Sequence, residues 1–134
     1  EEDGFNFENL NFTAKKGQLT MILGMIGSGK TSLLYSLLGE MRVKKGSGSR
    51  VSINGEITYL GQKPWLINGT VKENILMDKP LDQVKLDFAI KYSCLNDDLK
   101  GFENGLDNVL GEDGATISGG QKARIGLARC LYQE

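Results

Sequence analysis

Residues 24–31 read GMIGSGKT, and no other stretch of the chain constrains its architecture as strongly. The stretch satisfies the pattern GxxxxGKS/T, in which the backbone N–H groups of a glycine-rich loop curl around a phosphate group. The helix that follows such a loop adds the positive end of its dipole. Lys30 is suited to hold the β- and γ-phosphates of a nucleotide, and the Thr31 hydroxyl is a hard oxygen ligand for Mg²⁺. The motif therefore predicts a site for a nucleotide phosphate.

The residues on either side of this motif match the strand and the helix that it requires. Residues 19–23, LTMIL, form an apolar run that is typical of a buried strand. Apolar residues then recur at spacings of three and four, which predicts an amphipathic helix through Leu33, Leu34, Leu37, Leu38 and Met41. A chance match in a glycine-rich chain is the alternative, and the strand, loop and helix context argues against it. The predicted phosphate-binding residues are Gly24, Gly27, Ser28, Gly29, Lys30, Thr31 and Ser32.

Two further regions are expected to form strands. Residues 5–12 alternate loosely between apolar and polar side chains, as in a half-buried strand. Residues 51–53 and 57–60 flank the dipeptide Asn54-Gly55, which is a strong signal of a β-hairpin. We therefore expect β structure on both sides of the phosphate loop.

From Pro80 onward the pattern is helical. The first helix is expected to turn Asp82 and Asp87 outward and to bury a face made of Leu81, Val84, Phe88 and Ala89. Residues 96–116 are rich in Gly, Asp and Asn, which predicts loops with one irregular turn or helix. A last helix from Gly120 is expected to bury Ala123, Leu127, Ala128 and Leu131 and to point Lys122, Arg124 and Arg129 outward.

The composition argues against several classes of protein. A length of 134 residues corresponds to one domain or to part of one. The 16 basic and 17 acidic residues nearly cancel, so neither a nucleic-acid footprint nor a basic membrane-surface patch is supported. The apolar stretches are far shorter than the roughly 20 residues that span a bilayer. Cys94 and Cys130 share no CxxC spacing and histidine is absent, so we expect no zinc site and two reduced, buried thiols.

A second glycine motif, ISGGQ, occupies residues 117–121 at the start of the last predicted helix. A serine and two glycines at a helix N-terminus leave N–H donors that suit an anion, so the motif can act as another phosphate clamp. The alternative is an ordinary N-cap serine followed by a flexible glycine pair. Composition alone favours the N-cap interpretation.

Residues 117–129, ISGGQKARIGLAR, closely resemble the LSGGQ signature and the following helix of ATP-binding cassette (ABC) proteins, with Ile in place of the first Leu. Residues 24–31 match the Walker A loop of that family, and residues 59–75 look like its Q-loop region. The order and spacing of the three motifs match as well. The Gln62 to Trp65 stretch, the TVKENI run at 70–75, Cys94-Leu95 and LGE at 110–112 are most similar to the C subfamily. That group includes the multidrug-resistance-associated exporters, the sulfonylurea receptors and the cystic fibrosis conductance regulator.

The resemblance covers nearly all of the chain and implies an α/β fold, a P-loop NTPase core of the ABC ATPase type. It implies a β region with Walker A and the Q-loop over residues 1–75, and a helical subdomain with the signature helix over 76–134. In the family, the Walker B aspartate, the glutamate after it and a switch histidine follow the signature helix. We therefore expect a partial nucleotide-binding domain, incomplete at its C-terminal end, that binds nucleotide weakly and does not hydrolyse it alone.

In proteins that this chain resembles, two domains pair head to tail, so that ATP on one Walker A loop is covered by the signature of the other. By this resemblance, Ser118, Gly119 and Gly120 contact the γ-phosphate of ATP on the partner domain, and Gln121 supports the turn. Lys30 and Gln62 are the expected catalytic residues. Thr31 and Gln62 are the expected Mg²⁺ ligands.

Gln62 and Trp65, in the Q-loop region, can also be interpreted without a role in nucleotide chemistry. Gln62 can also be a solvent-facing glutamine at the end of a strand. Trp65 is expected to serve as a packing or coupling surface, because the family stacks adenine on an aromatic residue upstream of Walker A. That aromatic residue is expected to lie before Glu1, with Phe5 as the fallback within the chain.

The resemblance implies a transport-coupled ATPase on the cytosolic face of a membrane, as part of an integral membrane protein. Its expected partners are a second nucleotide-binding domain and transmembrane domains. The alternative is a non-hydrolytic, ATP-gated regulatory domain of a channel or receptor, while ISGGQ argues against a P-loop kinase or GTPase. The isolated chain is also expected to self-associate through the unpaired apolar edge at residues 19–23.

Overall fold

The computed structural model describes residues 6–43 and 48–133. The chain divides into two compact units, Glu1–Ile53 and Asn54–Glu134, and each is described by itself. Phe5 is both the fallback for an adenine contact and the first residue of the expected N-terminal strand, and it lies outside the described residues. The division expected at residue 75 stays a prediction, because it concerns the positions of motifs rather than the compactness of units.

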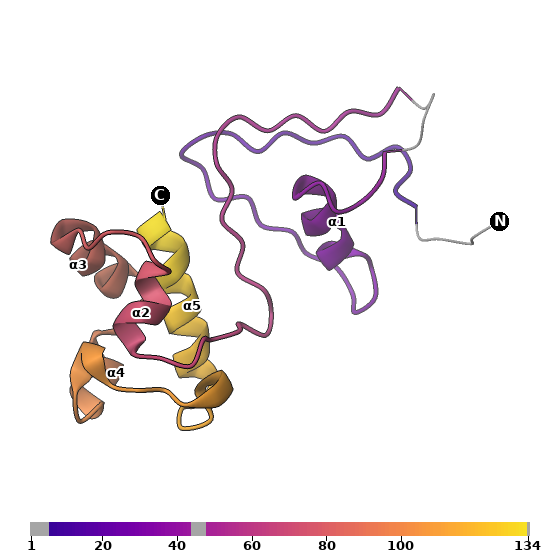
Figure 1. Cartoon of the computed structure of the whole chain (residues 1–134). Coiled ribbons are helices and arrows are strands. Elements are labelled where there is room, and N and C mark those ends of the chain that lie inside the picture. The colour runs from indigo at the N-terminus through magenta and orange to yellow at the C-terminus, as the bar shows by residue number, and fades with distance from the viewer. Residues whose placement is uncertain (1–5, 44–47, 134) are drawn as a thin grey trace. The chain divides into compact units, whose positions relative to one another are not determined.

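The first unit contains the helix α1, Lys30–Leu37, directly after the glycine loop (Figure 1). The predicted helix is thus confirmed, and it ends at a Schellman motif. Gly39 has a φ of 81°, the Gly39 N–H donates to Ser36 O over 3.3 Å, and the Glu40 N–H donates to Tyr35 O over 3.0 Å. Because the backbone turns into the left-handed region here, the apolar spacing that reaches Met41 does not continue the helix.

The expected strands are not formed by the described residues of the chain. Residues 19–23 form no strand, and two of their side chains, Leu19 and Leu23, are 88% and 83% exposed. The segments 51–53 and 57–60 form no strand either, although Gly55 has the positive φ that suits a turn. An apolar run states only that a segment favours burial. A strand also needs a partner that completes its ladder of hydrogen bonds.

The second unit is helical (Figure 1). Its elements are α2 Val71–Leu76, α3 Gln83–Tyr92, α4 Asn96–Gly101, α5 Gly119–Gln133 and the 3₁₀ helices η1 Gly105–Asp107 and η2 Glu112–Gly114. The α5 helix packs against both α2 and α3. An antiparallel bridge joins Thr70 to Val109. In the described part of the chain, no helix combines the length and the apolar character that crossing a bilayer demands.

Local sequence explains where α2 and α3 begin. Thr70 and Glu73 form a capping box, in which Thr70 Oγ1 accepts from the Glu73 N–H and the Glu73 carboxylate accepts from the Thr70 N–H. The Asp82 carboxylate accepts from the N–H groups of Val84 and Lys85. Both caps satisfy helix N–H groups that have no partner within the helix, so the two starts are fixed by residues next to them.

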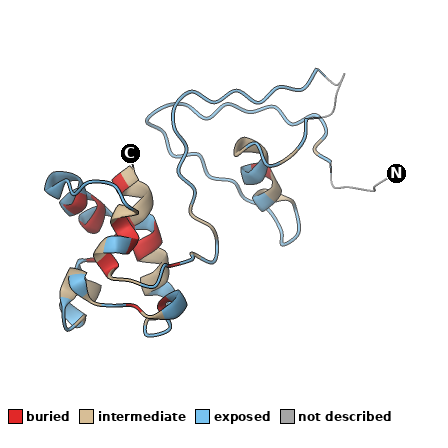
Figure 2. Ribbon diagram, viewed as in Figure 1, coloured by how far each residue is buried: buried red, intermediate tan, exposed pale blue. Residues whose placement is uncertain are grey.

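The buried residues of the second unit lie on the facing sides of its helices (Figure 2). The core consists of Leu66, Val71, Ile75, Leu86, Ala89, Ile90, Leu95, Leu110, Ile125, Ala128 and Tyr132. For α3 the expected face was wrong except at Ala89. Leu81 and Phe88 are about half exposed and Val84 is 80% exposed. The helix carries two apolar stripes, and only the one that meets α5 is buried.

The signature helix α5 buries only part of the expected set, in which Leu131 is partly buried against the core and Ala123 is half-buried. Ala128 is buried as predicted, while Leu127 is 37% exposed. Ile125, Gly126 and Tyr132 are buried in addition. Tyr132 latches the end of α5 to the start of α3, because its hydroxyl donates to Pro80 O over 2.5 Å and accepts from the Asp82 N–H over 2.8 Å.

Both cysteines are free thiols, and only one is sheltered. Cys130 is partly buried, and burial raises the pKa of its thiol, while a hydrogen bond with Thr58 acts in the opposite direction. Cys94 is exposed, with a φ of 58°, so the expectation of a buried thiol was wrong at this position.

Candidate functional site

The loop that precedes α1 is shaped by glycines with left-handed backbone conformations. Gly27 has a φ of 80° and Gly29, the N-cap of α1, has a φ of 87°. Side chains are strained in this region, so glycine is the residue that reaches it without cost. At Gly24 the lack of a side chain makes room for Ser28, since a Cβ there would lie 2.6 Å from Ser28 Oγ. The sequence pattern therefore matches a backbone that favours glycine at these positions.

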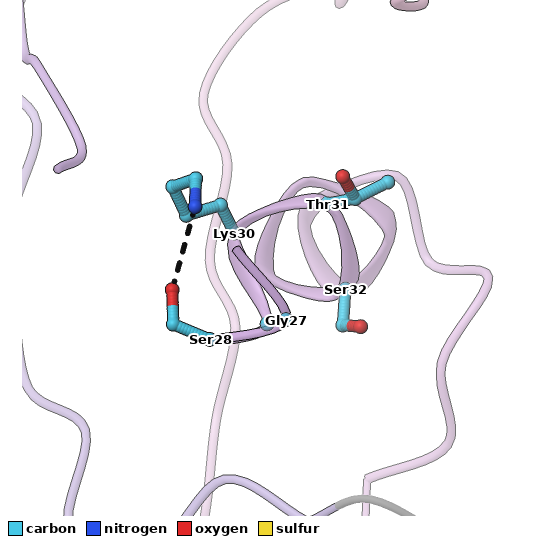
Figure 3. A pocket seen from close by; sticks show the side chains of 6 residues that line it. Gly27, Ser28, Lys30, Thr31 and Ser32 are labelled. Atoms are coloured by element: carbon cyan, nitrogen blue, oxygen red, sulfur yellow. Dashed lines mark hydrogen bonds between the residues drawn. The ribbon is translucent and has the colours of Figure 1, made fainter. Parts of the chain in front are cut away.

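Lys30 is folded back over this loop. Its Nζ donates to Gly24 O over 2.9 Å and to Met25 O over 2.7 Å, and it lies 3.5 Å from Ser28 Oγ (Figure 3). The ammonium is therefore held at the mouth of the loop by carbonyl oxygens. Phosphate oxygens carry more negative charge than carbonyls, so a phosphate at this place would compete for the same donor.

The loop and the first turn of α1 enclose an open hollow of about 330 Å³, lined by residues 27–32. The first bond of the helix runs from the Leu33 N–H to Gly29 O over 2.9 Å. The N–H groups of Lys30, Thr31 and Ser32 precede that bond, at the end of the helix where the dipole is positive. Figure 3 shows Thr31 and Ser32 leaving this turn in directions away from Lys30. The turn thus combines backbone donors, a cation and hydroxyl groups.

The residues present suit Mg²⁺ in their chemistry. Thr31 is exposed at the first turn of α1 and offers a hard hydroxyl oxygen. Mg²⁺ is usually held by one or two protein oxygens together with phosphate oxygens and water, so a single hydroxyl beside a phosphate loop is an adequate protein contribution. Gln62 also offers an oxygen, and it is exposed in a bend of the second unit. Its relation to Lys30 stays a prediction.

The turn at the start of α5 has the geometry of a reciprocal cap. Ser118 Oγ accepts from the Gln121 N–H over 3.3 Å, and Gln121 Oε1 accepts from the Ser118 N–H over 2.8 Å. The N-cap interpretation of Ser118 is therefore correct, and Gln121 supports the turn. Gly119 and Gly120 are exposed beside the cap. A capped helix N-terminus still favours an anion, so the phosphate-clamp role of these four residues stays a prediction.

Arg124 was expected to point outward, and instead it pairs with a carboxylate on α4. Its Nε donates to Asp98 Oδ2 over 2.5 Å and its Nη2 donates to Asp98 Oδ1 over 2.8 Å. This bidentate pair lowers the pKa of Asp98, and a hydrogen bond from the Gln121 side chain acts in the same direction. The signature turn is thereby braced against α4.

Asn74 is completely buried and uses its whole side-chain amide. Its Oδ1 accepts from the Ile67 N–H over 2.9 Å and from Arg129 Nη2 over 3.1 Å. Its Nδ2 donates to Ile67 O and Thr70 O, each over 3.0 Å. A buried polar group is tolerated only when it is hydrogen-bonded, and here every donor and acceptor is matched. Asn74 therefore fixes the loop before α2.

Arg129 was also expected to point outward, and it turns instead toward the residues that follow Gln62. Its Nε donates to Asn74 O over 2.8 Å and its Nη1 donates to Trp65 O over 3.1 Å. The guanidinium lies over the Trp65 ring, 4.4 Å from its centroid. Burial lowers the pKa of Arg129. Trp65 thus serves as a packing surface, as expected, while nothing in the spacing of the sequence identifies Arg129 or Asn74 as its partners.

The segment on both sides of Gln62 lies close against α5. A Cβ at Gly126 would be 2.7 Å from Leu60 Cδ1 and 3.1 Å from Pro64 Cβ. A side chain at position 126 would therefore displace Leu60 or Pro64. Gln62 itself is exposed between these two contacts.

The chain is similar over its length to proteins of one family. A family model described as ABC transporter matches residues 7–134. ABC transporter C family member 3 of Dictyostelium discoideum is 42% identical over 134 residues, which are 100% of this chain and 9% of that protein. Human ATP-binding cassette sub-family C member 4 is 42% identical over 127 residues, 95% of this chain and 9% of that protein. Metal resistance protein YCF1 of Saccharomyces cerevisiae is 46% identical over 125 residues, 93% of this chain and 8% of that protein. The chain spans about a tenth of the length of the curated relatives it matches.

Proposed function

Since the chain belongs to the ABC transporter family, we propose that it binds Mg-ATP on the loop before α1 and serves as part of the ATP-driven motor of a transporter. The observation that carries this proposal is the position of Lys30. Its ammonium is held over a glycine loop at the N-terminus of α1 by two carbonyl oxygens, within 2.9 Å of each. Phosphate oxygens would replace those carbonyls as its acceptors.

Several further residues have a defined part in this proposal. The N–H groups at the start of α1 would donate to phosphate oxygens, aided by the helix dipole. The left-handed glycines Gly27 and Gly29 keep Cβ atoms out of the curve of the loop. Thr31 and Gln62 would hold the cation, which when bound neutralises charge on the β- and γ-phosphates. Gln62 would in addition orient the attacking water, and with Lys30 it would make up the catalytic contribution of this chain.

The signature turn would act on a second copy of the site. Ser118, Gly119 and Gly120 are exposed at the N-terminus of a 15-residue helix, with Gln121 closing the turn behind them. We assign these residues to the γ-phosphate of ATP bound by a second nucleotide-binding domain, in a head-to-tail pair. ATP then joins two surfaces, and losing the γ-phosphate removes contacts to both, which is a two-state switch set by the ligand.

In the whole protein, this switch would drive transmembrane domains from the cytosolic side of the membrane. The chain is about a tenth of the length of its relatives, so the transport activity is proposed for the intact protein. The chain by itself is proposed to bind nucleotide without turning it over.

Calorimetric titration of the intact protein with Mg-ATP tests the proposal. The variant Lys30→Ala should bind at least about tenfold more weakly, a loss of about 1.4 kcal/mol. Lys16→Ala is the matched control, since Lys16 is an exposed lysine of the same unit outside the loop, and it should bind as the unchanged protein does. Absence of binding in the unchanged protein, or equal binding by Lys30→Ala, would refute the proposal.

A further inference from the structure

The segment that carries Gln62 is attached to α5 at two places. Leu60 and Pro64 lie against the backbone of Gly126, where a Cβ would approach them to 2.7 and 3.1 Å. One turn further along the same helix, Arg129 donates to the carbonyl oxygen of Trp65 over 3.1 Å. Since residues three apart lie on one face of a helix, both attachments belong to a single strip of α5.

Among the residues that the structure describes, Arg129 pairs with no carboxylate. Its hydrogen bonds end on oxygens of neutral groups, namely Asn74 O, Asn74 Oδ1 and Trp65 O, at 2.8 to 3.1 Å. The guanidinium also covers the Trp65 ring at 4.4 Å. A planar fork of five N–H donors can serve three oxygens and a ring face at once, whereas a lysine ammonium acts as a point charge. The arrangement therefore requires arginine and would not be formed by lysine.

The other end of α5 is the signature turn. Ser118 and Gln121 close that turn through their reciprocal hydrogen bonds, and α5 then runs for 15 residues to Gln133. A helix of this length extends about 22 Å and is stiff along its axis. Ser118, which caps α5, and Gly126 and Arg129, which contact the Gln62 segment, thus belong to one stiff helix.

We propose that Arg129 is a positioning residue for Gln62, which clamps the Gln62 segment to α5 so that this glutamine and the signature turn move as one body. This inference rests on the proposed function, because Gln62 and Ser118 have a common task only if nucleotide binds. Engagement of the turn at 118–121 then sets the place of the Gln62 oxygen through α5, Gly126 and Arg129. The clamp affects the chemical step rather than the affinity for ATP, since the hydrogen bonds of Arg129 go to Asn74 and Trp65, which are not among the residues proposed to hold the phosphates.

Replacement by lysine separates positioning from charge. Arg129→Lys keeps the cation and loses the fork, so Trp65 O and the two Asn74 oxygens no longer share one donor group. In the intact protein we expect kcat for ATP hydrolysis to fall at least fivefold, with KM for ATP within twofold of the unchanged protein. Gly126→Ala perturbs the same clamp without altering Arg129, because its Cβ pushes Pro64 away, and it should show the same split between kcat and KM.

Tyr132→Phe is the matched control. Tyr132 lies on α5 one turn beyond Arg129 and ties the helix to Pro80 and Asp82 rather than to the Gln62 segment. Its loss weakens the unit while leaving the clamp in place, so kcat should stay within twofold of the unchanged protein. An equal fall of kcat in Tyr132→Phe would overturn the proposal, as would full kcat in Arg129→Lys.

A second readout observes the clamp directly. Trp65 is the only tryptophan of the chain, so the tryptophan fluorescence of the 134-residue chain comes from this residue alone, and its anisotropy responds to the mobility of the Trp65 ring. Anisotropy should fall in Arg129→Lys and remain unchanged in Tyr132→Phe, and equal values in all three proteins would refute the clamp. If the intact protein fails to bind ATP, the proposed function fails and the Gln62 role fails with it. If it hydrolyses ATP and Arg129→Lys does so equally fast, only the inference fails.

Discussion

Replacing Asn74 with alanine should lower the free energy of unfolding of the second unit by about 3 kcal/mol. The asparagine amide makes four hydrogen bonds in a completely buried position. Each contributes about 1 kcal/mol net, and the better helix propensity of alanine returns less than about 1 kcal/mol. A unit of about 80 residues has a total stability of roughly 4–12 kcal/mol, so the loss is a large share of it.

Urea denaturation of the chain, followed by circular dichroism of its helices, measures this loss. With a slope of about 1–3 kcal/mol per molar urea, the midpoint should fall by about 1 M or more. Asn68→Ala is the matched control, since Asn68 is an exposed asparagine in the same loop, and its stability should stay within about 0.5 kcal/mol. A loss below about 1 kcal/mol for Asn74→Ala would mean that the amide does not hold the loop before α2.

Two further perturbations address the signature helix. Ser118→Ala removes the cap of α5 and should lower the free energy of unfolding by about 1 kcal/mol in a urea titration. Ser118→Asp keeps a capping oxygen and should therefore retain this stability. In the intact protein, Ser118→Asp should still weaken ATP-dependent pairing of the domains, measured by sedimentation, because the charge of the aspartate repels phosphate. The pair of Asp98 with Arg124 should make stability depend on acid. The folded pKa of Asp98 lies below its ordinary value of 3.8, so its contribution is present above that pH and is lost as the pH falls through the folded value. Unfolding curves recorded from neutral pH to below pH 3.8 should show a difference between the unchanged protein and Asp98→Asn that shrinks in acid, and a constant difference would contradict this assignment.

Features determined by neighbouring residues were predictable from the sequence. The helices that became α1, α3 and α5 follow from apolar spacing, and the positive φ angles of Gly27 and Gly29 agree with the glycine pattern of the loop. The cap of α5 also has a local signal, because a serine three residues before a glutamine is the pattern of a capping box. Each of these features depends on contacts within a few residues.

Features that depend on distant partners were missed. The run at residues 19–23 has the composition of a buried strand, yet burial requires a neighbour that this pattern does not specify. The α3 helix has one apolar stripe with Val84 and Phe88 and another with Leu86 and Ile90, and only packing against α5 decides that the second is buried. The sequence pattern predicts solvent-facing cations at Arg124 and Arg129, because their partners Asp98 and Asn74 lie 26 and 55 positions away in the sequence. Long polar side chains can also bury their stems, which periodicity does not record.

The phenol of Tyr132 has a consequence for how the second unit opens. The last turn of a helix ordinarily frays, because its final carbonyl groups have no partner within the helix. In α5 the last turn contains a buried hydroxyl that is shared with Pro80 O and the Asp82 N–H. Unwinding that turn would expose the start of α3 as well, so the two helix ends lose their structure together and form one cooperative unit of local unfolding.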